Sequence, residues 1–317
     1  MKTLKPIIIA AAILLTCQGV VGQLTPLKKF DYSLLEGKTL YIPTYKASEA
    51  FIKKMAKKGK YDKITTAKAK AEHYNTIWNE AMAESSYDAT DYEIRAFDRR
   101  KLIKEKNKKA ILLYFYRDDY GNRSAIMMAT APKKRVIART IITGLDLSSK
   151  NDLRLMINML NESLNTASEL EEEGDKSNKA VRNKYKEEVI KFTEELENKV
   201  FLVPKSEHKK PKKAAARTAD LKEALKSWKL SKYELTTAEA IENKRVEGDM
   251  DSFYWRDFPI YTQNVLITYH YNVILSCDGD DVLFAFLGKK RLKPATLEQI
   301  QKKIVAKGAR YKKQMAK

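Results

Sequence analysis

The sequence predicts an α+β protein in which two related units follow a cleaved signal peptide. The phrase "LLEGKTLYIP" at residues 34–43 returns as "ELENKVFLVP" at residues 195–204, and the segments after each copy follow the same order. A chain of 317 residues with 44% hydrophobic content is long enough to bury a core in each unit, which excludes a disordered protein.

The N-terminus has the pattern of a secretory signal over residues 1–22. Met1–Lys5 is basic, and the apolar run Pro6–Leu15 that follows is too short to span a bilayer. Small residues before Gln23 favour cleavage after Gly22, and the alternative is lipidation at Cys17 within "LLTC". We therefore expect export to the periplasm or the outer membrane.

The mature chain then keeps one cysteine, Cys277, so no intramolecular disulfide is possible. The net charge of +20 falls to about +18 once the two signal lysines are removed. Such a charge favours an anionic partner, for example a lipid headgroup, an envelope polymer, a nucleic acid or an acidic protein. Export argues against nucleic acid.

Each unit is expected to run helix, strand, helix, strand, strand, strand, helix. In the first unit, residues 23–166, the elements expected in order are a helix over 26–34, a strand Thr39–Ile42 stopped by Pro43, a helix over 70–84 with Trp78, strands over 111–117, 124–130 and 135–142, and a helix over 148–164. The aromatic strand "ILLYFYR" closes at Arg117.

The segment 167–198 is expected to be a largely helical linker with a break near Gly174, and it includes the entry helix of the second unit over 184–194. The second unit covers residues 199–317. Its expected elements are a strand Val200–Val203 stopped by Pro204, a helix over 218–232 with Trp228, a strand over 251–256 closing at Arg256, strands over 265–277 and 281–288, a helix over 294–308, and a basic tail. The spacing of equivalent residues drifts along the chain, as an old tandem duplication with insertions and deletions predicts.

No motif for nucleotide, metal or cofactor binding is found, and we predict no catalytic residue and no cofactor. "EGKT" at Glu36–Thr39 lacks the upstream glycine of a phosphate loop and precedes an expected strand. His73, His208 and His270 have no second ligand at metal spacing, and no serine lies in a nucleophile motif.

"CDGDD" at residues 277–281 predicts a hairpin turn at Asp278-Gly279, with Cys277 as a small buried residue. An Arg-Asp step ends the aromatic strand in both halves, at Arg117-Asp118 and Arg256-Asp257. We interpret it as an ion-paired strand end or turn, the alternative being a catalytic carboxylate.

Candidate binding residues come from two stretches. The basic run "KKPKK" contributes Lys209, Lys210, Lys212 and Lys213, and the distinctive stretch "ENKRVEGDMDSFYWR" contributes Tyr254, Trp255 and Arg256. The clusters "KKMAKKGKYDK" and "KKIVAKGARYKKQMAK" are also rich in lysine, which acts as a point charge and suits loose attraction to anionic surfaces.

The short signal ending near "GQ", the many lysines and tyrosines and the repeated unit resemble uncharacterised exported envelope proteins of Bacteroidota-type bacteria. The leading hypothesis is a non-enzymatic envelope binding or assembly protein that engages an acidic protein or an anionic envelope partner. The alternatives are an exported hydrolase of unfamiliar type, with a site near Arg256 and Asp257, and a direct binder of polyanions or lipid headgroups, associated peripherally with a membrane.

Overall fold

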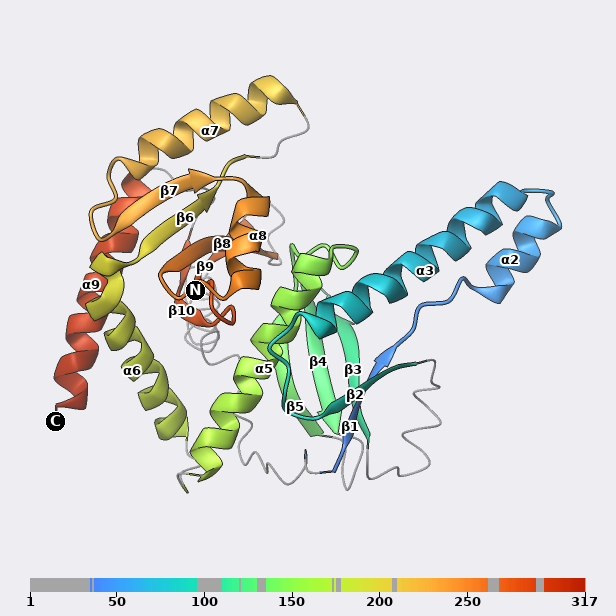
Figure 1. Cartoon of the computed structure of the whole chain (residues 1–317), viewed down its shortest axis with the longest axis horizontal. Helices are drawn as coiled ribbons and strands as arrows, with labels where there is room; N and C mark the ends of the chain where they lie inside the picture. Colours follow the sequence, from blue (N-terminus) through green and yellow to red (C-terminus); the bar gives the residue numbers. More distant parts are fainter. Residues whose placement is uncertain are drawn as a thin grey trace, which may run out of the picture. The chain divides into compact units, whose positions relative to one another are not determined.

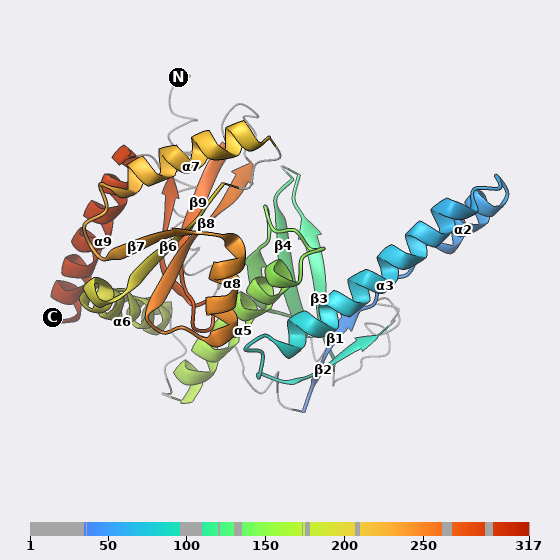
Figure 2. The ribbon, with the colours of Figure 1, turned by 45° about the horizontal axis from the view of Figure 1, so that its top comes forward.

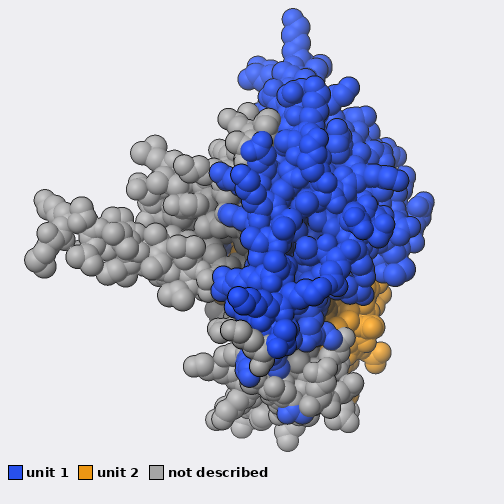
Figure 3. All heavy atoms as spheres, turned by 90° about the vertical axis from the view of Figure 1, so that its left-hand side faces the viewer, with its two compact units in different colours: residues 1–30, 117–122, 166–317 blue, residues 31–116, 123–165 orange. Residues whose placement is uncertain are grey.

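The computed structural model describes residues 35, 37–95, 110–119, 121–129, 135–172, 174, 178–206, 210–261, 268–288 and 294–316. The chain divides into two compact units, coloured separately in Figure 3. We call residues 31–116 and 123–165 the N-terminal unit, and residues 166–317 with 117–122 and 1–30 the C-terminal unit. The expected signal peptide, Cys17 and the entry helix over 26–34 lie outside the described residues.

Both units contain a mixed five-stranded sheet with helices, so the predicted α+β class is confirmed. The N-terminal sheet has the order β2-β1-β3-β4-β5. Its strands are β1 (Thr39–Pro43), β2 (Asp91–Arg95), β3 (Ala110–Arg117), β4 (Arg123–Ala129) and β5 (Arg135–Ile141). The C-terminal sheet has the order β7-β6-β8-β9-β10. Its strands are β6 (Val200–Pro204), β7 (Lys232–Thr236), β8 (Ser252–Tyr261), β9 (Thr268–Ser276) and β10 (Val282–Gly288).

The helices of the N-terminal unit are α2 (Glu49–Ala56), α3 (Tyr61–Ala83) and α5 (Lys150–Glu172), which continues into the C-terminal unit. Those of the C-terminal unit are α6 (Asn178–Glu195), a short 3₁₀ helix (Leu196–Asn198), α7 (Pro211–Leu225), α8 (Ala238–Glu247) and α9 (Pro294–Met315). Figure 1 labels these elements along the chain. Gly174, with a φ of +74°, lies between α5 and α6.

The expected unit of four strands was wrong, because each sheet has a fifth, β2 or β7. Each pairs in parallel with the first strand of its sheet, with Thr39 opposite Asp91 and Val200 opposite Lys232. Both strands are short and largely exposed, as an edge strand is, so they lack the apolar alternation that indicates a strand in a sequence.

The bounds of several other elements also differ from expectation, and two of these differences bear on the predicted site residues. Helix α7 ends at Leu225, so Trp228 follows the helix, and its indole packs on Phe201 with ring centroids 4.6 Å apart. Strand β8 does not close at Arg256 but continues to Tyr261, paired with β9 throughout, so Asp257 lies inside a strand. The predicted turn between β9 and β10 is confirmed, with Gly279 at a φ of +80°, and Cys277 is buried as expected.

The core of the C-terminal unit lies between α6, α7, α9 and one face of the sheet. Phe201 and Phe253 stack at 5.1 Å, and Phe192 of α6 meets Phe253 edge-on at 5.4 Å. Side chains alternate along a strand, so Tyr254 points to the opposite face, where α8 lies (Figure 2). One face of this sheet is therefore covered by α6, α7 and α9, and the other by α8.

In the N-terminal unit, α3 and α5 pack on the same side of the sheet. Two buried asparagines of α5 hold the loop that leads from α3 to β2. Asn158 Oδ1 accepts the backbone N–H of Ser86 at 2.9 Å, and Asn161 Nδ2 donates to the Ser86 carbonyl at 2.7 Å. In the C-terminal unit, Gln301 of α9 holds the loop after α7 in the same way, through Lys229 N and Ser227 O.

Candidate functional site

The structure does not bring the predicted binding residues together into one site. Lys210, Lys212 and Lys213 are exposed at the start of α7, and Lys209 lies outside the described residues. Tyr254, Trp255 and Arg256 are consecutive in β8, so Trp255 points to the face opposite to that of its two neighbours.

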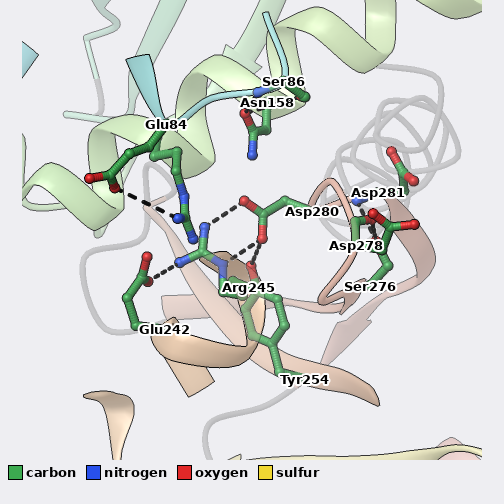
Figure 4. Close-up of polar contacts among 11 residues, drawn as sticks. Glu84, Ser86, Asn158, Glu242, Arg245, Tyr254, Ser276, Asp278, Asp280 and Asp281 are labelled. Carbon is green, nitrogen blue, oxygen red and sulfur yellow. Dashed lines mark hydrogen bonds and ion pairs between the residues drawn. The ribbon is translucent and has the colours of Figure 1, made fainter. Parts of the chain in front are cut away.

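Tyr254 belongs to a buried polar cluster rather than to a binding surface (Figure 4). Its hydroxyl donates to Asp280 at 2.7 Å, and the Arg245 guanidinium donates to both oxygens of the same carboxylate at 2.5 Å. Arg245 also pairs with Glu242 and lies 5.3 Å from the centre of the Tyr254 ring. Burial, with the nearby Asp280 charge, raises the pKa of Tyr254 well above its ordinary value, so the hydroxyl stays protonated. The cluster fastens α8 and the β9–β10 turn to β8.

On the other face of the same sheet, a chain of polar contacts crosses between β8 and β9. The indole Nε1 of Trp255 donates to Asn272 Oδ1 at 3.0 Å, and Asn272 Nδ2 donates to the His270 carbonyl at 3.1 Å. The His270 Nδ1 lies 2.5 Å from Asp257 Oδ2. Trp255 and Asp257 thus act in a cross-strand network rather than in a turn, which corrects the interpretation of the Arg256-Asp257 step as a strand end.

His270 is the chemically distinctive member of this network. Its side chain is 10% exposed, and its Nε2 is buried with no hydrogen-bond partner among the described residues. In a neutral imidazole with Nδ1–H donated to Asp257, Nε2 carries a lone pair. A carboxylate that orients an imidazole in this way is the arrangement used by general bases and by metal-binding histidines.

A metal centre is not supported at this position. Within the parts of the chain that the structure describes, no group of three or more His, Cys, Asp or Glu side chains could hold a metal ion. His73 is exposed on α3. The pairing of His270 with Asp257 was invisible in the sequence, because the two residues are thirteen apart and meet only through the β8–β9 register.

One concentrated basic feature among the described residues is the helical hairpin made by residues 46–70, which we call the basic arm. It holds α2 and the first part of α3, and it contains nine lysines and two carboxylates, a net charge of +7. All nine lysines are exposed. α2 buries no residue, and the buried residues of α3 begin only at Ala71. Figures 1 and 2 show the arm extending beyond the N-terminal sheet.

The base of the arm is fixed to the sheet. The side-chain amide of Asn75 clasps Tyr45 by accepting from its N–H at 2.8 Å and donating to its carbonyl at 3.2 Å. A line of rings then leads inward from Tyr45 through Tyr74 and Trp78 to Phe115, with centroids 5.4, 6.0 and 6.3 Å apart. Because α3 is one continuous helix of 23 residues, the arm is held in a defined direction from its own sheet.

No family model matches the chain, and comparison with curated proteins and with solved structures found no match. Among the described helices, none has the length and apolar content to cross a membrane.

Proposed function

We propose that the protein is a non-enzymatic binding protein that engages an anionic envelope partner through the basic arm. The observation that carries the proposal is that residues 46–70 concentrate a charge of +7 on two helices that bury no side chain before Ala71. The segment contributes no side chain to the core, and its like charges repel one another. We therefore attribute the concentration of lysines to binding of an anionic partner.

The chemistry of the arm favours an extended polyanion over a small ligand. Its cations are all lysines, which act as mobile point charges and lack the fork of donors with which arginine grips one phosphate or carboxylate. They lie just before α2, on both helices and in the turn at Gly59, so the charge is spread along the whole hairpin. Lys210, Lys212 and Lys213 at the start of α7 supply a second, smaller basic area.

An envelope location is part of the proposal. Its support is the signal-like pattern of residues 1–22. In that setting the partner is an anionic envelope polymer or an acidic envelope protein. Lipid headgroups are the third possible source of negative charge.

We further propose that the two units arose by tandem duplication. Both sheets have the same strand order and the same parallel pairing of their first three strands, and Pro43 and Pro204 close equivalent strands. The following residue makes the same contact in each unit, with Thr44 N donating to the Arg95 carbonyl and Lys205 N to the Thr236 carbonyl. Agreement at this level is expected of a shared ancestor.

The binding proposal is tested with two variants of equal charge. The arm variant changes Lys53, Lys54, Lys57 and Lys58 to Gln, and the control changes four exposed lysines of the C-terminal unit, Lys191, Lys222, Lys302 and Lys313, to Gln. Binding is measured to heparin, to polyglutamate and to vesicles of phosphatidylglycerol with phosphatidylcholine, across a range of salt.

The arm variant is expected to lose roughly tenfold or more in affinity at low salt, because each lysine near an anionic surface contributes about 1 kcal/mol, and the loss shrinks as salt screens the charges. The control should lose much less. The probe that the protein binds most tightly indicates whether the partner is an anionic polymer, an acidic polypeptide or a lipid surface. Equal losses of affinity in the two variants would show that binding depends on net charge alone, and would refute a specific role for the arm.

A second function, hydrolysis, is favoured by one specific observation, the buried His270 with its Nδ1 on Asp257. The oriented imidazole would act as a general base through Nε2 if a substrate reached this buried nitrogen. Asp257→Asn should then abolish hydrolysis of a panel of p-nitrophenyl esters without lowering the melting temperature. A large loss of stability with no activity in the parent protein would assign the pair to structure alone.

A further inference from the structure

Aromatic side chains lie exposed among the lysines of the basic arm. Tyr61, close to the turn at Gly59, is 66% exposed, and Phe51 of α2 is 38% exposed. Tyr45, at the base of the arm, is 54% exposed although its ring contacts that of Tyr74. These rings leave apolar area open to solvent within a strongly cationic segment, so a partner that the lysines attract can also cover the rings.

Each helix of the arm carries its exposed ring in line with a lysine. In α2, Lys54 follows Phe51 at position i+3, and in α3, Lys68 follows Tyr61 at position i+7. Residues at these spacings lie on the same side of a helix. Both lysines are exposed. A ring and a cation on one side of each helix can therefore contact the same molecule.

The arm does not have the apolar face with which a helix enters a membrane surface. Within residues 46–70, all of which the structure describes, the larger aliphatic side chains Ile52, Met55 and Ile64 are half-buried. A helix that lies in the membrane interface needs a continuous apolar side. The exposed rings are instead set apart along the hairpin and lie among cations. This arrangement favours a partner in which apolar surface and negative charge alternate.

We infer that the partner of the basic arm is an acidic polysaccharide, a polymer of sugar rings that carry carboxylate or sulfate groups. The faces of a sugar ring present C–H groups, whose slightly positive hydrogens pack on the electron-rich face of an aromatic ring, while the acid groups attract lysine. An acidic polypeptide supplies the charge without such faces. The inference rests on the proposed function and narrows its partner to one class.

The test compares two carboxylate polymers, alginate, which is built of sugar rings, and polyglutamate, which has none. The ring variant changes Phe51 and Tyr61 to Gln, and the control variant changes Tyr92 and Tyr233, exposed tyrosines of the edge strands β2 and β7, to Gln. Neither variant alters the net charge, and circular dichroism checks folding. Tyr61→Gln alone repeats the comparison at the more exposed ring, which the core does not need. Affinity is measured across a range of salt, with vesicles of phosphatidylglycerol and phosphatidylcholine as a third probe.

The ring variant is expected to lose roughly fivefold or more in affinity for alginate, because two contacts between a ring and a sugar are lost, each comparable to an aromatic pair. The ratio between parent and variant should persist as salt rises, since salt screens charges and not apolar contacts. Affinity for polyglutamate should not change. The control variant should bind both polymers as the parent does.

Equal losses for alginate and polyglutamate, or no loss for either, would overturn the assignment to a polysaccharide, and a loss confined to vesicles would assign the rings to a lipid surface instead. The lysine variant of the arm separates this inference from the proposed function. If that variant keeps its affinity for alginate, both are refuted. If it loses affinity while the ring variant binds as the parent does, the arm binds anions and only the polysaccharide is refuted.

Discussion

Gly308 offers the sharpest test of the packing between α6 and α9. A Cβ at this position would meet Thr193 at 2.7 Å from Oγ1, 2.9 Å from Cγ2 and 3.0 Å from Cβ, all shorter than ordinary van der Waals contact. Relieving the overlap requires the two helices to separate, and such overpacking costs about 1–3 kcal/mol. The higher helix propensity of alanine returns about 1 kcal/mol. We expect Gly308→Ala to lower the free energy of unfolding by up to about 2 kcal/mol.

The assay is urea unfolding followed by tryptophan fluorescence, to which Trp228 and Trp255 report from this unit. Thr193→Ala removes the two shortest contacts, so the double variant should recover most of the loss, and the two substitutions should couple by roughly 1–2 kcal/mol. If Gly308→Ala instead raises the free energy of unfolding through its higher helix propensity, or if Thr193→Ala does not restore the stability of the Gly308→Ala variant, α9 does not approach α6 as closely as described.

Two further predictions concern buried charge. Asp280→Asn should lower the free energy of unfolding by about 2–4 kcal/mol, because it removes the carboxylate that neutralises buried Arg245. Asp281→Asn, at the exposed next residue, is the control and should cause no such loss. Equal effects of the two substitutions in thermal unfolding would contradict this prediction. Burial lowers the pKa of Lys307 in α9 to about 8, which means that this side chain binds more protons in the unfolded chain between about pH 8 and 10.5, so its own contribution to stability rises with pH in that window. Lys307→Met should abolish this rise, worth about 2 kcal/mol after allowance for partial exposure, and an unchanged pH profile would contradict it.

The sequence was a good guide where strands are buried and a poor one where they are exposed. β1 and β6 were predicted to within a residue, because their apolar runs end at Pro43 and Pro204. β2 and β7 were missed, since an edge strand can be stabilised by its backbone pairing alone and needs no apolar pattern. The end of α7 was placed too late because Trp228 was counted as helical, whereas it packs on Phe201 from the loop after the helix.

The chemistry of single residues was harder to predict than the fold. Asp280 reads as a turn residue, and its φ of +63° agrees with that, yet its carboxylate is buried beneath Arg245. His270 and Asp257, like Lys307 and Tyr185, meet only through strand register or helix packing. A sequence gives the residue types and their local spacing, but contacts between distant segments appear only after the chain has folded.

The basic arm lies where the described parts of the two units differ, in the connection between the first two strands of each sheet. The first unit joins β1 to β2 through two helices, α2 and α3, and this longer crossover carries the arm. Between β6 and β7 the described residues of the second unit form a single helix, α7. Connections tolerate insertion because they contribute few core contacts, whereas the sheet must keep its register. If the units share an ancestor, the two-helix crossover that carries the basic arm is the part of the described chain in which they have diverged. The two units are then not interchangeable, and replacing α2 and the first half of α3 with a short loop should remove polyanion binding while leaving both sheets folded.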